Sequence, residues 1–141
     1  MRLSRRWRSQ RGTAMVEFAV VLPIFLFVIW CVVDFARAFY TQNSLASAVR
    51  EGARYAAVTG SPGSSATLTG VRTRVAQSFN AFGGSPIPSA SITVVNDSAI
   101  GKVSVKVTNY QWLTTTPITI FTNGQILMTK TATFRWEREG T

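Results

Sequence analysis

A run of sixteen residues without a charge, Phe18 to Val33, constrains this chain more than any other feature. Counted from Thr13, the apolar stretch is 21 residues long, and about 20 residues of helix cross a bilayer. Pro23 removes one backbone hydrogen bond, which a membrane helix tolerates where neighbouring groups compensate. A soluble helix that is apolar on every face would need a larger protein around it. We therefore predict a transmembrane helix over residues 13–33.

The basic residues are distributed unevenly around this predicted span. The net charge is +9, and residues 1–12 carry five arginines and no acid, namely Arg2, Arg5, Arg6, Arg8 and Arg11. Positive charge beside a span marks the cytoplasmic flank. An arginine-rich tail could also bind nucleic acid or anionic lipid headgroups. We favour the topological interpretation and expect no nucleic-acid partner.

A secretory signal peptide is the main alternative to a retained anchor. It would also have a basic start and an apolar core, and Ala36-Arg37-Ala38 resembles a signal peptidase site. However, the apolar run is long, Glu17 interrupts its start, and the helical pattern continues beyond Ala38. These features favour a helix that stays attached.

The helical pattern continues from residue 34 to residue 58 as an amphipathic stalk. Its predicted apolar seam has spacings of four and three, and consists of Phe35, Phe39, Gln42, Ala46, Val49, Ala53 and Ala56. Ala48, Gly52 and Ala56 form a ladder of small residues that lets another backbone come close. For most of these residues we expect packing against the chain's own domain.

The remaining residues predict a small α+β domain. Residues 59–66 form a Gly/Ser/Pro linker, and residues 67–141 form the domain. A short amphipathic helix is expected over 68–82, closed by Gly83-Gly84. Alternating apolar residues predict a hairpin of 90–94 and 103–107 and a further strand over 126–136. The complete fold class is α+β, with a long N-terminal helix, a short second helix and a small antiparallel sheet.

The sequence offers little for catalysis. Histidine is absent, and the single cysteine, Cys31, lies in the apolar run, so no disulfide within the chain is possible. We find no phosphate-binding glycine loop, metal-ligand cluster or nucleophile motif. We therefore expect no enzyme activity, no cofactor, no metal and no small-molecule substrate.

Several motifs together resemble a known family. They are a basic leader ending in Gly12, an acid at Glu17 within Gly12-Thr-Ala-Met-Val-Glu-Phe-Ala19, the pair Leu22-Pro23, and Ala48-Val-Arg-Glu-Gly-Ala-Arg-Tyr-Ala-Ala57. This combination resembles prepilins, and more narrowly the TadE-like family of minor pilins or pseudopilins of Tad (Flp) pili. The close resemblance covers about residues 10–58.

The resemblance implies a function and specific residues. A prepilin peptidase would remove leader 1–12 by cutting between Gly12 and Thr13, so that Glu17 becomes the fifth residue and pairs with a neighbouring subunit. Phe18 would belong to the span or its docking surface. The expected partners are the peptidase, other pilins or pseudopilins, the Tad assembly machinery and the membrane. The protein would cross the cytoplasmic membrane once, with its C-terminal domain outside and possible incorporation in a pilus.

The sequence leaves open the TadE or TadF type, methylation of the new amino terminus, the oligomeric state and the partner of the β-rich domain. The alternative functions are a binding domain secreted after cleavage at Ala38, and a membrane-tethered binder that acts through its arginine tail.

Overall fold

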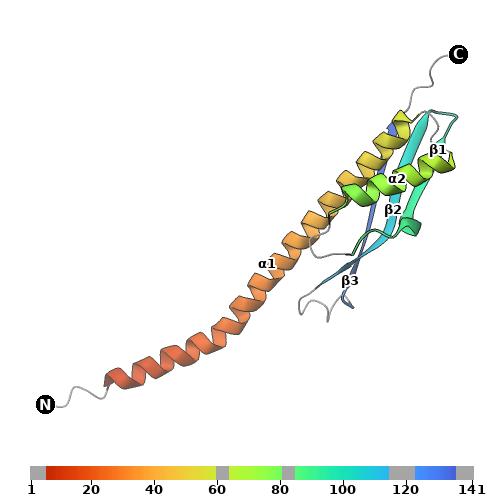
Figure 1. Ribbon diagram of the computed structural model, residues 1–141. Coiled ribbons are helices and arrows are strands. Elements are labelled where there is room, and N and C mark those ends of the chain that lie inside the picture. The colour runs from red at the N-terminus through yellow and green to blue at the C-terminus, as the bar shows by residue number, and fades with distance from the viewer. Residues whose placement is uncertain (1–5, 60–63, 81–84, 115–122, 136–141) are drawn as a thin grey trace.

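A computed structural model describes residues 6–59, 64–80, 85–114 and 123–135 of the chain, with side chains from Gly12 onward. One long helix and a small domain make up this structure (Figure 1). The helices are α1 (Arg6–Val58), α2 (Ser65–Ser78) and the short 3-10 helix η1 (Ser89–Ser91). The strands are β1 (Ile92–Asp97), β2 (Lys102–Leu113) and β3 (Gln125–Arg135). The predicted α+β class is confirmed.

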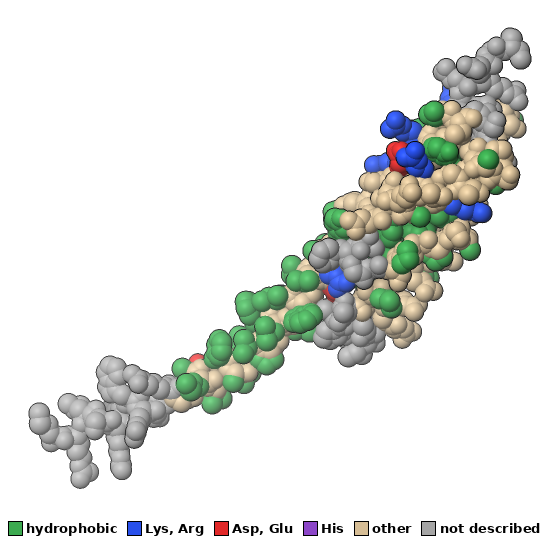
Figure 2. Space-filling model, in the orientation of Figure 1, with side chains coloured by type: hydrophobic (Ala, Val, Ile, Leu, Met, Phe, Trp, Pro, Cys, Tyr) green, Lys and Arg blue, Asp and Glu red, His purple; other side chains and the backbone are tan. Residues whose placement is uncertain are grey.

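The helix α1 has two parts with different surroundings. Its C-terminal part packs along α2 and the sheet, and its N-terminal part extends away from the domain as a curved arm (Figure 1). Pro23 lies in this arm, and a proline inside a helix removes a hydrogen bond and bends the axis. Hydrophobic side chains cover the visible surface of the arm (Figure 2).

The buried face of α1 differs from the predicted seam. Phe35 and Phe39 are 73% and 59% exposed, and Gln42 is also exposed, so the first half of the predicted seam is wrong. The buried stripe is displaced by about one residue from the predicted seam. It comprises Asp34, Thr41, Leu45, Ala48, Val49, Gly52, Ala53 and Ala56. Small side chains dominate this stripe because they allow the second layer to approach the helix closely. The polar Thr41 can be buried because its hydroxyl donates a hydrogen bond to the Arg37 carbonyl.

The helix α2 begins earlier and ends earlier than the predicted 68–82. Ser64 caps it by accepting a hydrogen bond from the Thr67 amide at 3.2 Å, so the first turn starts inside the predicted linker. The helix ends at Ser78 because Phe79 adopts an extended conformation. The Phe79 ring packs edge-on against Tyr110, with 5.0 Å between ring centroids. The predicted closing pair Gly83-Gly84 lies outside the described residues.

The three strands form one antiparallel sheet in the order β1-β2-β3. The predicted hairpin is present, and Val94 pairs with Val105, which in turn pairs with Ala132 of β3. Its first strand begins at Ile92 and not at Ala90, because residues 89–91 form the 3-10 helix η1, and it continues beyond Val94 to Asp97. The strand β2 is longer than predicted, because it continues beyond Val107 to Leu113. One face of the sheet is buried against α1 and carries the valines 103, 105 and 107.

A bulge in β2 determines which side chains are buried in the second half of that strand. The pairing of β2 with β3 shifts between Val107 and Tyr110, and Asn109 there has φ of +54°. The extra residue changes the alternation, so that Tyr110 and Trp112 point to the same face as Val107. Tyr110 and Trp112 are the largest fully buried side chains among the described residues. The bulge therefore brings two aromatic rings into the core.

Candidate membrane and assembly site

The arm of α1 has the properties of a membrane span. Its most apolar window has a mean hydropathy of 2.7 and is not buried within the structure. A core helix of a soluble protein would be covered by its own domain, whereas these side chains lie in the open (Figure 2). Residues 13–33 rise about 31 Å as helix, which matches a hydrocarbon core of about 30 Å. The described residues thus contain one helix that is consistent with a single-pass membrane anchor.

The predicted processing and assembly residues lie together near the start of this arm. Gly12 is exposed, and a Cβ built there would meet nothing within 4 Å. Thr13 and Glu17 are exposed one helical turn apart, about 6 Å along the axis. Phe18 is 63% exposed. The backbone is helical through Gly12 and Thr13, so a protease would need to unwind it locally before cutting there.

Glu17 lies at the apolar surface of the anchor without a compensating charge in the described part of the chain. The ion pairs found among the described side chains join Asp34 to Arg37 and Glu51 to Arg54, and neither involves Glu17. A carboxylate within a span costs roughly 2.5–3.5 kcal/mol at the bilayer centre and less near an interface. A cation placed beside Glu17 would therefore lower this cost.

The ladder of small residues is buried in the structure, and its middle member, Gly52, faces α2. Ala48, Gly52 and Ala56 are buried, and Gly52 packs against Val71 and Val75 of α2. A Cβ at position 52 would be 3.4 Å from Val71 Cγ1 and still closer to Val75 Cγ2. The close approach that this ladder permits is thus made within the domain.

A second group of residues joins the anchor to the sheet, and the sequence analysis did not single it out. Asp34 is only 4% exposed, and its Oδ1 lies 3.4 Å from Nη1 of Arg37. The Arg37 guanidinium lies 5.9 Å from the centroid of the Trp112 ring. The signal available in the sequence was an oppositely charged pair three residues apart at the end of the apolar run. Its meaning depended on Trp112, which is far away in the sequence.

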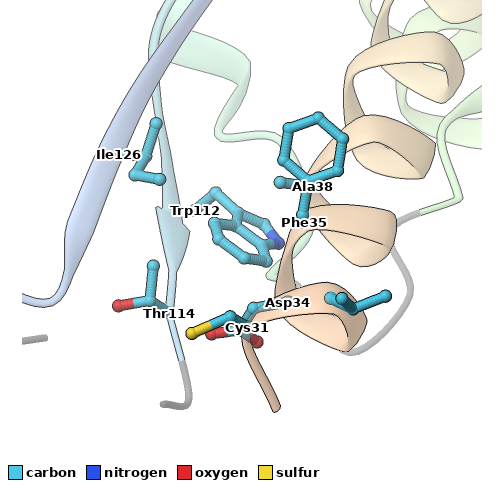
Figure 3. A pocket seen from close by; sticks show the side chains of 8 residues that line it. Cys31, Asp34, Phe35, Ala38, Trp112, Thr114 and Ile126 are labelled. Atoms are coloured by element: carbon cyan, nitrogen blue, oxygen red, sulfur yellow. The ribbon is translucent and has the colours of Figure 1, made fainter. Parts of the chain in front are cut away.

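These contacts fix the domain at the end of the span. In Figure 3, Trp112 extends from β2 toward α1, and Ile126 and Thr114 lie on the opposite side from Phe35 and Ala38. The Arg37–Trp112 contact and the buried Asp34 hold the first turns beyond residue 33 against the sheet. The anchor and the domain are therefore connected by packing as well as by the chain.

Comparison with known protein families identifies the anchor segment. Residues 12–54 match the family model described as TadE-like protein. The anchor segment is TadE-like. The match begins at Gly12, covers the apolar arm and ends four residues before α1 does. It associates the protein with Tad pili and with the membrane.

The TadE-like segment accounts for α1 alone, and the match includes neither α2 nor the sheet. No curated protein and no solved structure matches the chain significantly. The roles of the domain must therefore be argued from its own residues. Among the described residues, no group of three or more acidic or cysteine side chains is arranged to hold a metal ion.

Proposed function

We propose that this protein is a minor pilin or pseudopilin, processed between Gly12 and Thr13 by a prepilin peptidase, that contributes to assembly or initiation of a Tad pilus. The observation that carries the proposal is Glu17. Its carboxylate is exposed on the anchor one turn after Thr13, where the described side chains provide no ion-pair partner. The domain beyond residue 33 lies outside the cell membrane, and the arginine-rich leader lies in the cytoplasm.

The proposed processing step would create the missing charge. Cutting after Gly12 makes Thr13 the amino terminus, and a free amine has a reference pKa of about 7.7–8.0. At neutral pH this amine is largely protonated and can pair with a carboxylate. In the assembly, Glu17 of one subunit pairs with the new amino terminus of its neighbour. The role is structural, and we propose no catalysis by this chain.

The size of the domain favours a minor subunit over a major one. Major Flp pilins resemble a bare helix, whereas here α2 and the strands β2 and β3 of a three-stranded sheet pack on the C-terminal half of α1. Subunits with such a domain are suited to an initiating complex or to sparse positions in the filament.

A domain secreted after cleavage at Ala38 is the alternative that the geometry disfavours. The helix α1 runs through this position without a break, and Ala38 packs against the core. Cleavage there would remove Asp34 and Arg37 and expose Trp112, which is now only 1% accessible. A buried aromatic ring contributes strongly to folding, so the released domain would be destabilised.

Mass spectrometry of the mature protein tests the processing step directly. We expect a chain that begins at Thr13. A first residue of Phe39 would instead support secretion, and a retained Met1 would leave a simple tethered protein.

Glu17→Gln tests the assembly contact because it keeps the shape of the side chain and removes its charge. We expect normal processing but few or no pili in the variant. Glu51→Gln is the matched control, since Glu51 lies on the same helix outside the span and pairs weakly with Arg54 at 3.9 Å. Normal piliation with Glu17→Gln would refute the assembly role.

A further inference from the structure

A cavity of about 450 Å³ lies between α1 and the sheet at the point where the predicted span ends. Ligand pockets commonly measure about 300–1,000 Å³, so the space is large enough for a small ligand or a chain segment. Its exposed lining is almost entirely apolar, although two of the eight lining residues are polar (Figure 3). The lining consists of Cys31, Val32, Asp34, Phe35 and Ala38 of α1 with Trp112, Thr114 and Ile126.

The cavity lies at the level where acyl chains meet headgroups. If residues 13–33 cross the hydrocarbon core, Cys31 and Val32 belong to the last turn inside it. Val32 and Phe35 are 63% and 73% exposed, so the cavity lining is continuous with the lipid-facing surface of the anchor. The hydrophobic molecule available at this position is a membrane lipid.

Two buried polar groups on residues that line the cavity have no hydrogen-bond partner among the described residues. Trp112 is 1% exposed and its Nε1 has no acceptor, and Thr114 is 9% exposed and its Oγ1 is unpaired. An indole N–H can only donate, and a hydroxyl can also donate. Buried donors without an acceptor are uncommon in native proteins. Both atoms are covered by other protein atoms, however, and almost no polar atom faces the cavity, so an occupant of the cavity must be apolar.

We propose that this cavity binds one acyl chain of a membrane glycerolipid. The apolar lining complements an acyl chain, which has neither hydrogen-bond donors nor acceptors. A bound lipid would fix the domain close to the membrane surface at a set height. The inference rests on membrane anchoring alone, and neither processing after Gly12 nor pilus assembly is needed for it.

The charges around the cavity indicate which part of the lipid is recognised. Asp34 lines the cavity, and Arg37 beside it carries the opposite charge, with 3.4 Å between Oδ1 and Nη1. The pair is neutral overall, so it gives an anionic headgroup little net attraction. We therefore expect binding to depend on the acyl chain and to be similar for zwitterionic and anionic lipids.

Tryptophan fluorescence in vesicles tests the proposal. The full-length protein would keep Trp112 alone, with Trp7, Trp30 and Trp136 replaced by Phe, in phosphatidylcholine vesicles with brominated acyl chains. Bromine quenches tryptophan on contact, so we expect a loss of Trp112 emission relative to unbrominated vesicles. Ala38→Phe or Ile126→Phe fills the cavity and should restore the emission. Circular dichroism identifies whichever filling variant keeps the native fold.

Two single-tryptophan controls separate the possible causes. A chain with Trp30 alone reports insertion of the anchor, because Trp30 lies in the span. A chain with Leu113→Trp alone places the indole one residue from position 112 on the outer face of β2, where Leu113 is 58% exposed. We expect Trp30 to be quenched and the indole at position 113 to stay bright.

Three outcomes would overturn the proposal. If Trp30 is quenched and Trp112 stays bright, the anchor is inserted but no lipid enters the cavity. If position 113 is quenched as strongly as position 112, or the filling variants change nothing, the domain only rests on the bilayer. If Trp112 emission depends on the protein-to-lipid ratio and not on bromine, a second copy of the chain occupies the cavity. Retention of one lipid in native mass spectrometry, lost on filling the cavity, would support the proposal independently.

Discussion

Gly52→Ala tests how closely α1 and α2 are packed. A methyl group at position 52 would lie far inside van der Waals contact with Val75 Cγ2, and 3.4 Å from Val71 Cγ1. Both valines are fully buried. A valine in a helix has one strongly preferred rotamer, so Val75 cannot turn aside at low cost. The added methyl group must therefore push α2 away from α1.

Two opposing contributions determine how Gly52→Ala changes the free energy of unfolding. Replacing Gly by Ala inside a helix stabilises it by about 1 kcal/mol. Overpacking a buried contact costs about 1–3 kcal/mol. Because the contact is with a stiff, fully buried side chain, we expect the upper half of this range and a net loss of about 1–2 kcal/mol in the free energy of unfolding. For a domain of this size the loss lowers Tm by about 5–15 °C.

The assay is thermal unfolding of the full-length protein in mild detergent, followed by near-ultraviolet circular dichroism. Gly70→Ala is the matched control in α2. A Cβ there would approach the ring of Tyr55, at 2.6 Å from Cε1, and this half-buried ring can move. We therefore expect Gly70→Ala to leave Tm unchanged or to raise it. The reasoning is refuted if Gly52→Ala is as stable as the unmodified protein.

A double-mutant cycle isolates the contact between positions 52 and 75. Val75→Ala removes Cγ2, the atom that the new methyl group would meet. In this background Gly52→Ala should stabilise the protein by about 0.5–1 kcal/mol, because only the helix-propensity gain remains. The sign of the Gly52→Ala effect should thus reverse between the two backgrounds. An unchanged sign would show that Val75 is not the source of the cost.

Two further predictions concern polar contacts in the domain. Ser64→Ala removes the cap that accepts from the Thr67 amide and should cost about 0.5–2 kcal/mol, measured as a lower Tm; an unchanged Tm would show that the cap does not hold α2. Tyr110→Phe removes the hydrogen bond from the phenol to the Ser85 carbonyl at 2.7 Å and should cost about 0.5–1.5 kcal/mol near pH 7. Burial raises the pKa of Tyr110 above its usual value of 10.0, so this residue's contribution is complete below about pH 10 and is lost as pH rises through the folded-state pKa. The difference in Tm between the unmodified protein and Tyr110→Phe should therefore shrink at high pH, and a difference that grows there would contradict the assignment.

The sequence predicted the elements that depend on local pattern. The apolar run and the helical spacing after it were enough to predict a single long helix, because a span and an amphipathic stalk both follow from composition at 3.6 residues per turn. Alternation in 90–94 and 103–107 was enough to predict the hairpin. Gly12, Glu17 and the motif at 48–57 indicated the TadE-like family, and the family match covers residues 12–54.

The sequence did not predict the register of the packing. The large residues Phe35 and Phe39 suggested one buried stripe, but the sheet and α2 pack on the neighbouring face, where Ala48 and Gly52 allow closer approach. Similarly, the alternation in β2 stopped being readable after Val107. The bulge at Asn109 moves the next two aromatic residues to the inner face, and a single unpaired residue leaves no clear periodic signal.

What the sequence determined by itself is the anchor: its length, its flanking charge and the position of Glu17 follow from residues that are close together in the chain. What only the tertiary structure decided is the junction of anchor and domain. Arg37, which pairs with Asp34, meets Trp112, 75 positions later, only after the sheet has formed and the bulge has turned that ring inward. The cavity beside them depends on the same contacts. A pattern of neighbouring residues cannot encode such contacts, because they depend on how two distant faces fit together.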